Sequence, residues 1–212
     1  MPNGYTARLA LTNEDLRAAY VLRDEVFCAE QGYSADRELD ALDDTAAHMV
    51  LVSDEDQHVL GVVRILAYPL PEEEPESYPP TRKDGDDLPG GGRTEAQVME
   101  TFQEKQQRLE ETSQDFLLSG GKIGRVAVSK ALRGKGAGRM LMEAAEAWII
   151  KALASAPYVQ SAQNVDAKIQ LSAQVIAKRF YDSLGYTSDD VQYLEEGEPH
   201  QWYKKVVSIK RV

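Results

Sequence analysis

A run of glycines and basic residues lies between Arg125 and Ile149, where an apolar, strand-like segment gives way to a helical pattern. A helix N-terminus carries unpaired amides and a partial positive charge, so it binds anions. Glycines let the backbone approach a phosphate closely, and basic side chains add charge-assisted hydrogen bonds. The run is therefore suited to a diphosphate. Its members are Arg133, Gly134, Lys135, Gly136, Gly138 and Arg139.

Two familiar phosphate-binding patterns do not match this run. A nucleotide-hydrolase loop needs Ser or Thr after its Gly-Lys pair, whereas Gly136 follows Lys135 here. The dinucleotide pattern G-x-G-x-x-G is also broken, because the spacing is G-x-G-x-G. A basic, glycine-rich turn that only caps its helix is the alternative to a ligand-binding loop.

Two segments resemble the signatures of a known family. The segment VAVSKALRGKGAGRMLM resembles the acetyl-coenzyme A signature of the GNAT N-acetyltransferases, whose core reads R/Q-x-x-G-x-G/A, with Arg133, Gly136 and Ala137 at the matching positions. The segment FYDSLGY is similar to a second family element, F-Y-x-x-x-G-F. A narrower resemblance, to the bacterial ElaA/YjcF-type branch, rests on RDEVFCAEQG, ELDALDDTAAHMVL, LSAQVIAKRFYDSLGY and EEGEPHQWYKK.

The resemblance implies a single GNAT-like α/β domain over residues 1–212, with a mixed, mostly antiparallel sheet flanked by helices. It implies an acetyl-CoA-dependent N-acetyltransferase that transfers the acetyl group directly to a primary amine through a tetrahedral intermediate. A non-catalytic acyl-CoA-binding or protein-interaction module of the same fold is the alternative. The coenzyme-binding residues that it implies are Val126, Ala127, Val128, Arg133, Gly134, Lys135, Gly136, Ala137, Gly138, Arg139 and Lys178.

Acetyl transfer to an amine needs a base for the amine, donors for the oxyanion and an acid for the leaving thiolate. Tyr181 matches the family tyrosine near the coenzyme sulfur, which implies the acid. Glu30, at the end of the first predicted helix, is expected beside the acceptor cleft as the base. Asp43, Asp44 and Glu195 are alternatives, and a chain of waters is another.

Further residues are expected to contact the substrates. Glu30, Gln31 and His200 are predicted to bind the acceptor, and His200 could instead act as the base or be structural. Lys178 could meet the coenzyme 3′-phosphate or only solubilise its helix. Cys28, the single cysteine, has no His or Asp context for a nucleophile, so we expect a buried helical thiol and no metal site.

Strands and helices must position these residues, and apolar periodicity predicts where they lie. In the predicted helix 136–154, Leu141 and Trp148 are expected to face the core, and Glu146 to face away from it. The predicted strands cover residues 5–11, 48–54, 58–68, 121–129, 167–173, 191–196 and 200–209, and the predicted helices cover 12–32, 136–154 and 174–185.

The part of the chain between residues 68 and 118 has a different composition. Residues 68–92 hold six of the nine prolines and a triple glycine, which predicts a mobile loop without a core. Residues 94–118 are expected to form a helix that touches the body through Val98, Phe102 and Leu109. Together they predict an insertion at about residues 69–118, whose replacement by a short turn should leave a folded protein. A lid over the acceptor cleft is the alternative.

Composition also restricts partners and location. The net charge of −11 argues against general binding to nucleic acid or anionic membranes, and mildly favours a cationic acceptor. We expect a small-molecule amine rather than a protein acceptor, and a monomer or homodimer. Without a signal-peptide pattern or an apolar run near the roughly 20 residues that span a bilayer, the expected location is cytoplasmic, although a nuclear one also fits.

Overall fold

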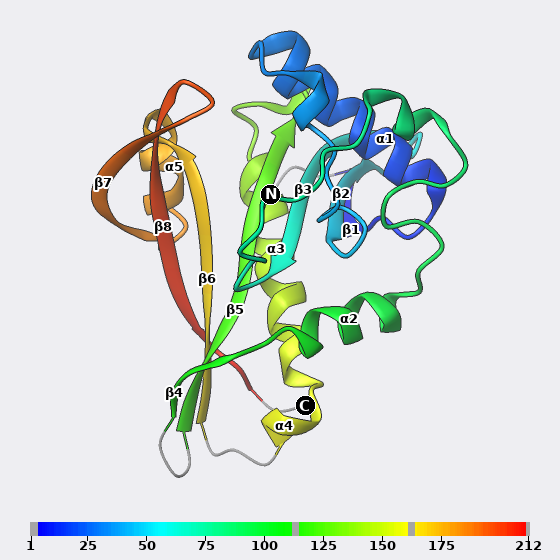
Figure 1. Ribbon diagram of the computed structural model, residues 1–212. Helices are drawn as coiled ribbons and strands as arrows, with labels where there is room; N and C mark the ends of the chain where they lie inside the picture. Colours follow the sequence, from blue (N-terminus) through cyan, green and yellow to red (C-terminus); the bar gives the residue numbers. More distant parts are fainter. Residues whose placement is uncertain (1–3, 112–114, 161–163, 211–212) are drawn as a thin grey trace.

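The computed structural model of the chain describes residues 4–111, 115–160 and 164–210. A mixed sheet in the order β1-β2-β3-β5-β6-β8-β7 forms its centre, with β4 paired to β5 (Figure 1). All paired strands are antiparallel except β5 and β6. The strands are β1 (Tyr5–Leu9), β2 (Ala47–Ser53), β3 (Val59–Ala67), β4 (Arg108–Glu111), β5 (Asp115–Val128), β6 (Asn164–Gln174), β7 (Thr187–Glu195) and β8 (Glu198–Ser208).

Helices cover both faces of the sheet, and this confirms the predicted α/β class. The alternation of strand side chains divides the core in two, because successive residues point to opposite faces. Met49 and Leu51 of β2 belong to the cluster under α2 and α3, whereas Val50 and Val52 belong to the cluster under α1. The helices are α1 (Asn13–Arg23), α2 (Glu95–Glu104), α3 (Ala137–Ala154), α4 (Pro157–Gln160) and α5 (Lys178–Asp182).

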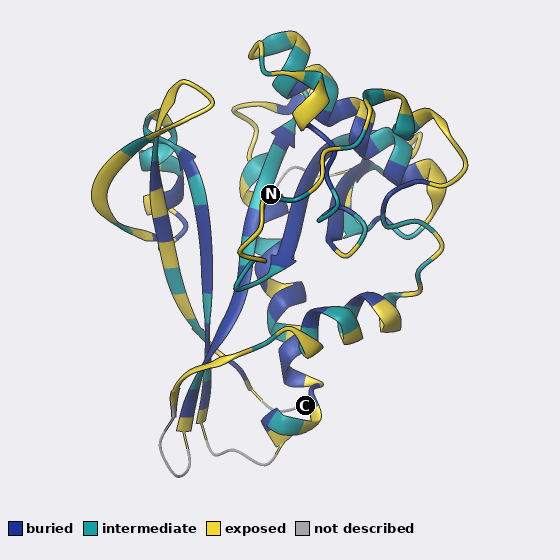
Figure 2. Cartoon of the chain, viewed as in Figure 1, coloured by how far each residue is buried: buried dark blue, intermediate teal, exposed yellow. Residues whose placement is uncertain are grey.

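The first helix follows the predicted pattern closely. The Thr12 hydroxyl accepts a hydrogen bond from the Asp15 amide at 3.1 Å and caps α1. After Arg23 the helix continues as a π-helical segment, Asp24–Glu30. Figure 2 shows the buried residues concentrated in the central strands and in α3, while the turn between β7 and β8 is exposed.

The helix predicted over residues 94–118 is correct only in its first half. α2 buries Val98 and Phe102 as expected, but it ends at Glu104, and Leu109 lies on β4 with 45% of its surface exposed. The helix stops because the next residues bond to β5. The Gln106 Oε1 atom accepts a bond from the Gly120 amide at 2.8 Å, and the Gln107 amide donates to the Ser119 hydroxyl at 2.9 Å.

The proline-rich stretch contributes to the core, contrary to the sequence expectation. Its backbone is irregular apart from a 3₁₀ turn at Pro80–Asp84, but Leu88 is buried in the cluster under α1. The carbonyl of Pro89 accepts a hydrogen bond from the Tyr20 hydroxyl at 2.6 Å. These contacts favour loss of stability, rather than a folded product, when residues 69–118 are replaced by a turn.

Glu146 is a second correction, because the sequence pattern placed it away from the core. Leu141, Ala145, Trp148 and Ala152 are buried as predicted, but only 8% of Glu146 is exposed as well. Its Oε2 atom accepts a hydrogen bond from Lys205 Nζ at 2.6 Å. A buried carboxylate is tolerated when it is paired in this way, and helical periodicity alone does not reveal a partner on β8.

The packing of α2 generates a stability prediction. Phe102 is 4% exposed, and its ring meets the Trp148 ring edge-on with centroids 5.2 Å apart. We expect Phe102→Ala to lower the free energy of unfolding by about 3–5 kcal/mol, because it leaves a cavity. Leu109→Ala, on exposed β4, is the control and should change it by less than about 0.5 kcal/mol. Urea unfolding measures both, and equal effects would contradict this view of the segment.

Candidate active site

The sheet opens between the two parallel strands. Residues of β5 and β6 pair from Asp115↔Asn164 to Lys122↔Gln170, and beyond that point the strands diverge (Figure 1). Residues 123–128 of β5 keep β3 as their only strand partner within the described chain. Backbone groups on the β6 side of this segment are thus available to pair with an extended ligand, as a free sheet edge does.

A β-bulge lies in the unpaired part of β5. Val62 pairs with Ala127 and Arg64 with Gly124, so Arg125 and Val126 together stand opposite one residue of β3. Arg125 has a φ of 49°, which is uncommon for a residue with a side chain. Such bulges bend a strand and re-aim side chains and backbone groups. Both Arg125 and Val126 border the pocket described below.

The glycine-rich run follows β5 and leads into α3. Gly134 and Gly136 have φ values of 74° and 88°, a region that favours glycine. The first amides of α3 have no acceptor within the helix. A Cβ atom at Gly138 would lie 3.3 Å from the Phe180 ring, so the absent side chain allows α5 to pack beside the start of α3. The predicted coenzyme-binding backbone therefore lies at the open end of the diverging strands.

Most basic side chains of this region already bind protein groups. Arg133 donates to Glu30 at 2.7 Å and to the Val128 carbonyl at 2.9 Å. Arg139 donates to the Ser183 hydroxyl at 2.9 Å. Lys178, which was predicted to bind the coenzyme, pairs with Asp190 at 3.0 Å. This hydrogen bond raises the pKa of its ammonium group.

Lys135 differs from these residues. Its side chain makes no hydrogen bond or ion pair with the described residues, and Lys135 is exposed at the tip of the glycine loop. It can bind an anion without first breaking an ion pair.

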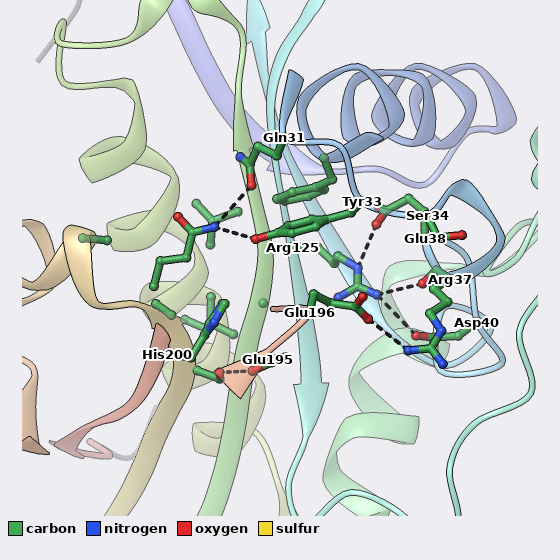
Figure 3. A pocket seen from close by; sticks show the side chains of 18 of the residues that line it. Gln31, Tyr33, Ser34, Arg37, Glu38, Asp40, Arg125, Glu195, Glu196 and His200 are labelled. Atoms are coloured by element: carbon green, nitrogen blue, oxygen red, sulfur yellow. Dashed lines mark hydrogen bonds and ion pairs between the residues drawn. The ribbon is translucent and has the colours of Figure 1, made fainter. Parts of the chain in front are cut away.

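A pocket of about 370 Å³ lies where the strands diverge (Figure 3). Gln31 and Tyr33 border it from the chain that follows α1, and His200 and Glu195 reach it from the β7–β8 hairpin. Tyr181 borders it from α5. Three of the residues predicted from sequence, namely Gln31, Tyr181 and His200, thus share one pocket, although they are far apart in the sequence.

Tyr181 lies in a buried, aromatic environment. Its side chain is 6% exposed and packs against the rings of Phe180 and Tyr203, with centroids 5.0 and 5.1 Å away. Burial, followed by the charge of Tyr203, raises the pKa of the Tyr181 hydroxyl far above its usual value. The hydroxyl is therefore protonated at neutral pH, as an ordinary tyrosine is, and the raised pKa makes it a weaker acid.

Glu30 does not line this pocket. Its carboxylate pairs with Arg133 at 2.7 Å and lies 3.8 Å from Lys130. The hydrogen bond from Arg133 lowers the pKa of Glu30, which makes it a weaker base. The geometry disfavours the predicted base role for Glu30, which instead joins the end of the π-helical segment to the glycine loop.

A buried ionic network forms the wall of the pocket beneath α1. Arg23 is fully buried and donates to Glu38 at 2.5 Å and to Asp43 at 2.8 Å. Arg64 lies 2.8 Å from Asp40 and 3.1 Å from Asp43. Each carboxylate of this network thus has an arginine partner, as burial of charge requires.

These partners determine the protonation of the network. Burial alone would raise the pKa of Asp43, but Arg23 and Arg64 hold it well below its usual range. His48 has a pKa lowered to about 3, chiefly by burial, so the imidazole is neutral. Asp43 is therefore an ion-pair partner and not the alternative base that the sequence analysis considered.

Sequence reasoning did not identify this network, although a signal was present. Arg23 occupies a position in the apolar helical series that contains Leu16, Ala19 and Val26. An arginine on the core-facing stripe of a helix requires buried acids, and the nearby acids Glu38, Asp40 and Asp43 supply them.

A glycine-rich helix start thus lies at the opening of two parallel strands, and comparisons with known proteins identify the family. Two family models, each described as an acetyltransferase (GNAT) domain, match residues 22–143 and 101–188. The chain belongs to the GNAT acetyltransferase family, as predicted. No curated protein sequence matches it significantly.

Solved structures share the fold. A protein from Lactobacillus plantarum assigned as an N-acetyltransferase is 23% identical, with a TM-score of 0.58 over 96% of this chain and 99% of that one. An acyl-CoA N-acyltransferase from Pseudomonas aeruginosa is 22% identical, with a TM-score of 0.55 over 95% and 98%. Escherichia coli ElaA, whose branch the sequence resembles, is 20% identical, with a TM-score of 0.51 over 95% and 97%.

Two kinds of feature are absent from the residues that the structure describes. No helix among them is both long enough and apolar enough to cross a bilayer. Within the same residues, no group of three or more His, Cys, Asp or Glu side chains is arranged to hold a metal ion.

The left-handed conformation of Gly136 generates a binding prediction. Gly136→Ala and Gly136→Asp should both be destabilised by about 1–2 kcal/mol, because each places a side chain at positive φ. Only Asp adds a negative charge beside the anion site, so calorimetry should give a Kd for acetyl-CoA at least about tenfold weaker for Asp than for Ala. Equal Kd values in the two variants would exclude the loop as the diphosphate site.

The network around Asp43 generates a second prediction. Asp43→Asn leaves Arg23 and Arg64 without their shared charge and should lower the free energy of unfolding at pH 7 by about 3–5 kcal/mol. Since the folded-state pKa of Asp43 is depressed, its contribution is present above the unfolded pKa of about 3.9 and is lost as the pH falls towards the folded value. The difference from wild type should therefore shrink in acid. Asp36→Asn, at an exposed position, is the control for urea unfolding.

Proposed function

We propose that this chain is an acetyl-CoA-dependent N-acetyltransferase that acetylates the primary amine of a small molecule. Membership of the GNAT family supports an acyl-CoA-dependent acyltransferase in general. The observation that carries the finer proposal is the position of Tyr181, which borders the same pocket as the bulged, unpaired edge of β5.

The residues present fit a coenzyme with a diphosphate and an extended arm. The amides of Gly134 and of Gly136 to Arg139 would hold the diphosphate at the start of α3, with Lys135 supplying an unpaired cation. The free backbone edge of Val126, Ala127 and Val128 would pair with the arm, as a strand pairs with a sheet edge.

Bound acetyl-CoA supplies the acetyl group as a thioester, whose carbonyl carbon the amine attacks. An amide of the bulge at Arg125 and Val126 would donate a hydrogen bond to the thioester oxygen, where negative charge develops. The Tyr181 hydroxyl would give its proton to the departing sulfur. The rings of Phe180 and Tyr203 pack against that of Tyr181.

The pocket supports a small, cationic acceptor. Its volume of about 370 Å³ suits a small molecule more than a folded protein surface. Acidic side chains in its lining outnumber the two arginines, Arg37 and Arg125. The acids are Glu38, Asp40, Glu74, Glu195 and Glu196. An accessible pocket beside Tyr181 also favours catalysis over a module that only binds acyl-CoA.

Screening small amines against acetyl-CoA with a thiol-release assay tests this proposal, and a panel without turnover would contradict it.

The role of Tyr181 generates a kinetic prediction. Tyr181→Phe keeps the ring packing and removes the acid, so kcat should fall by about 10²–10⁴-fold while the Kd for acetyl-CoA stays within about twofold. Tyr5→Phe, on the edge strand β1, is the control and should behave as wild type. Steady-state kinetics with the best amine of the panel, together with calorimetry, measure both. A Tyr181→Phe variant with full kcat, where chemistry limits turnover, would refute the assignment.

A further inference from the structure

Most of the acidic residues around the pocket are already paired with arginines. Glu38 and Asp40 face Arg23, Arg64 and Arg125 in the ionic wall. Glu196 lies 3.3 Å from Arg37 and bridges the turn between β7 and β8 to the chain after α1 (Figure 3). A carboxylate paired with a guanidinium is a poor proton acceptor, so these acids do not supply the base that the reaction needs.

His200 stands apart from them. It lies on β8, where its register partners are Gln174 of β6 and Tyr193 of β7, and its ring borders the pocket (Figure 3). The ring packs near that of Tyr193, with centroids 6.4 Å apart. No ion pair holds it among the described residues, in contrast with His48, which is buried in the ionic wall.

One hydrogen bond fixes which nitrogen of His200 carries hydrogen. Nδ1 lies 2.9 Å from the carbonyl oxygen of Glu198. A carbonyl only accepts hydrogen bonds, so Nδ1 must be the N–H donor. In the neutral imidazole the other nitrogen, Nε2, then has a free lone pair. The backbone of the β7–β8 hairpin thus orients the ring and leaves Nε2 as its hydrogen-bond acceptor.

We propose that His200 is the general base of this chain, and this inference rests on the acetyl transfer proposed above. As the bond from the amine nitrogen to the carbonyl carbon forms and the carbon–sulfur bond breaks, Nε2 of His200 takes the proton that the nitrogen loses. Tyr181 gives a proton to the sulfur. Exchange with water returns the proton to Tyr181 and removes one from His200, so the cycle balances.

The groups that surround His200 fit this role. Gln174 on β6 is neutral and donates to the Tyr33 hydroxyl at 2.6 Å. Glu195 on β7 accepts a hydrogen bond from Ser172, whose hydroxyl also accepts one from Tyr193 at 2.6 Å. The arginines that border the pocket, Arg37 and Arg125, are held by acids of their own. Among the acids of the described pocket lining, Glu74 and Glu195 pair with no arginine. Glu195 lies on the same hairpin as His200, so it serves as the competing assignment in the test.

The test uses a variant that keeps a donor in place of Nδ1 but removes Nε2. In His200→Asn the side-chain amide can still donate to the Glu198 carbonyl, but nothing replaces Nε2. We expect kcat for the best amine to fall by about 10²–10⁴-fold, with the Kd for acetyl-CoA within about twofold of wild type. Added imidazole should restore part of the kcat of His200→Ala. His58→Gln, in the exposed turn between β2 and β3, is the matched control.

The possible results distinguish the inference from the proposed function. An Asn variant with kcat within about threefold of wild type, and an intact Kd for acetyl-CoA, would overturn the role of His200 alone. Loss of kcat in Glu195→Gln, with none in His200→Asn, would overturn it and assign the base to Glu195. A wild-type chain that turns over no amine would overturn the proposed function and this inference together. A deficit in His200→Asn that appears only in KM would also overturn it, because it would indicate acceptor binding instead.

Discussion

The site depends on one constraint, which is that the parallel strands β5 and β6 stop pairing after Lys122 and Gln170. Unpaired backbone groups next to a core need other partners, and here the sheet offers them to a ligand. The divergence also creates the space into which Tyr181 and the β7–β8 hairpin reach. The bulge at Arg125 lies in the same unpaired segment, where the extra residue alters the pairing with β3 alone.

The buried ionic wall serves a different purpose from the opening. Arg23 joins α1 to Glu38 and Asp43, and Arg64 joins β3 to Asp40 and Asp43, so helix, sheet and loop have one fixed arrangement. Ion pairs of this kind contribute little net stability but tolerate few alternative packings. They also neutralise the acids of the wall, so that the wall sets the shape of the pocket and not its proton chemistry.

The sequence could predict the family, most strands and the glycine loop, because each rests on local periodicity or on a contiguous motif. It could also place Gln31, Tyr181 and His200 in a site, through their motifs. It could not predict the end of α2 at Glu104, since the bonds to Ser119 and Gly120 are made with another strand and leave no local pattern. The partners of Glu30 and Glu146 are far more remote in the sequence, being Arg133 and Lys205. The residue types alone therefore suggested a base at Glu30 and a solvent-facing acid at Glu146, whereas in the structure both carboxylates are held in ion pairs.

The pair between Glu30 and Arg133 also bears on how an anion is held at the glycine loop. The two groups are 2.7 Å apart, and Arg133 lowers the pKa of Glu30. A phosphate that drew the guanidinium away would leave Glu30 without its partner, and by linkage that loss would weaken the binding of the phosphate. Amides bear no such penalty, since the first turn of α3 has no other acceptor for them. The backbone and Lys135 are thus better placed than Arg133 to bind the diphosphate, and Arg133 keeps the loop in position beside the end of the π-helical segment.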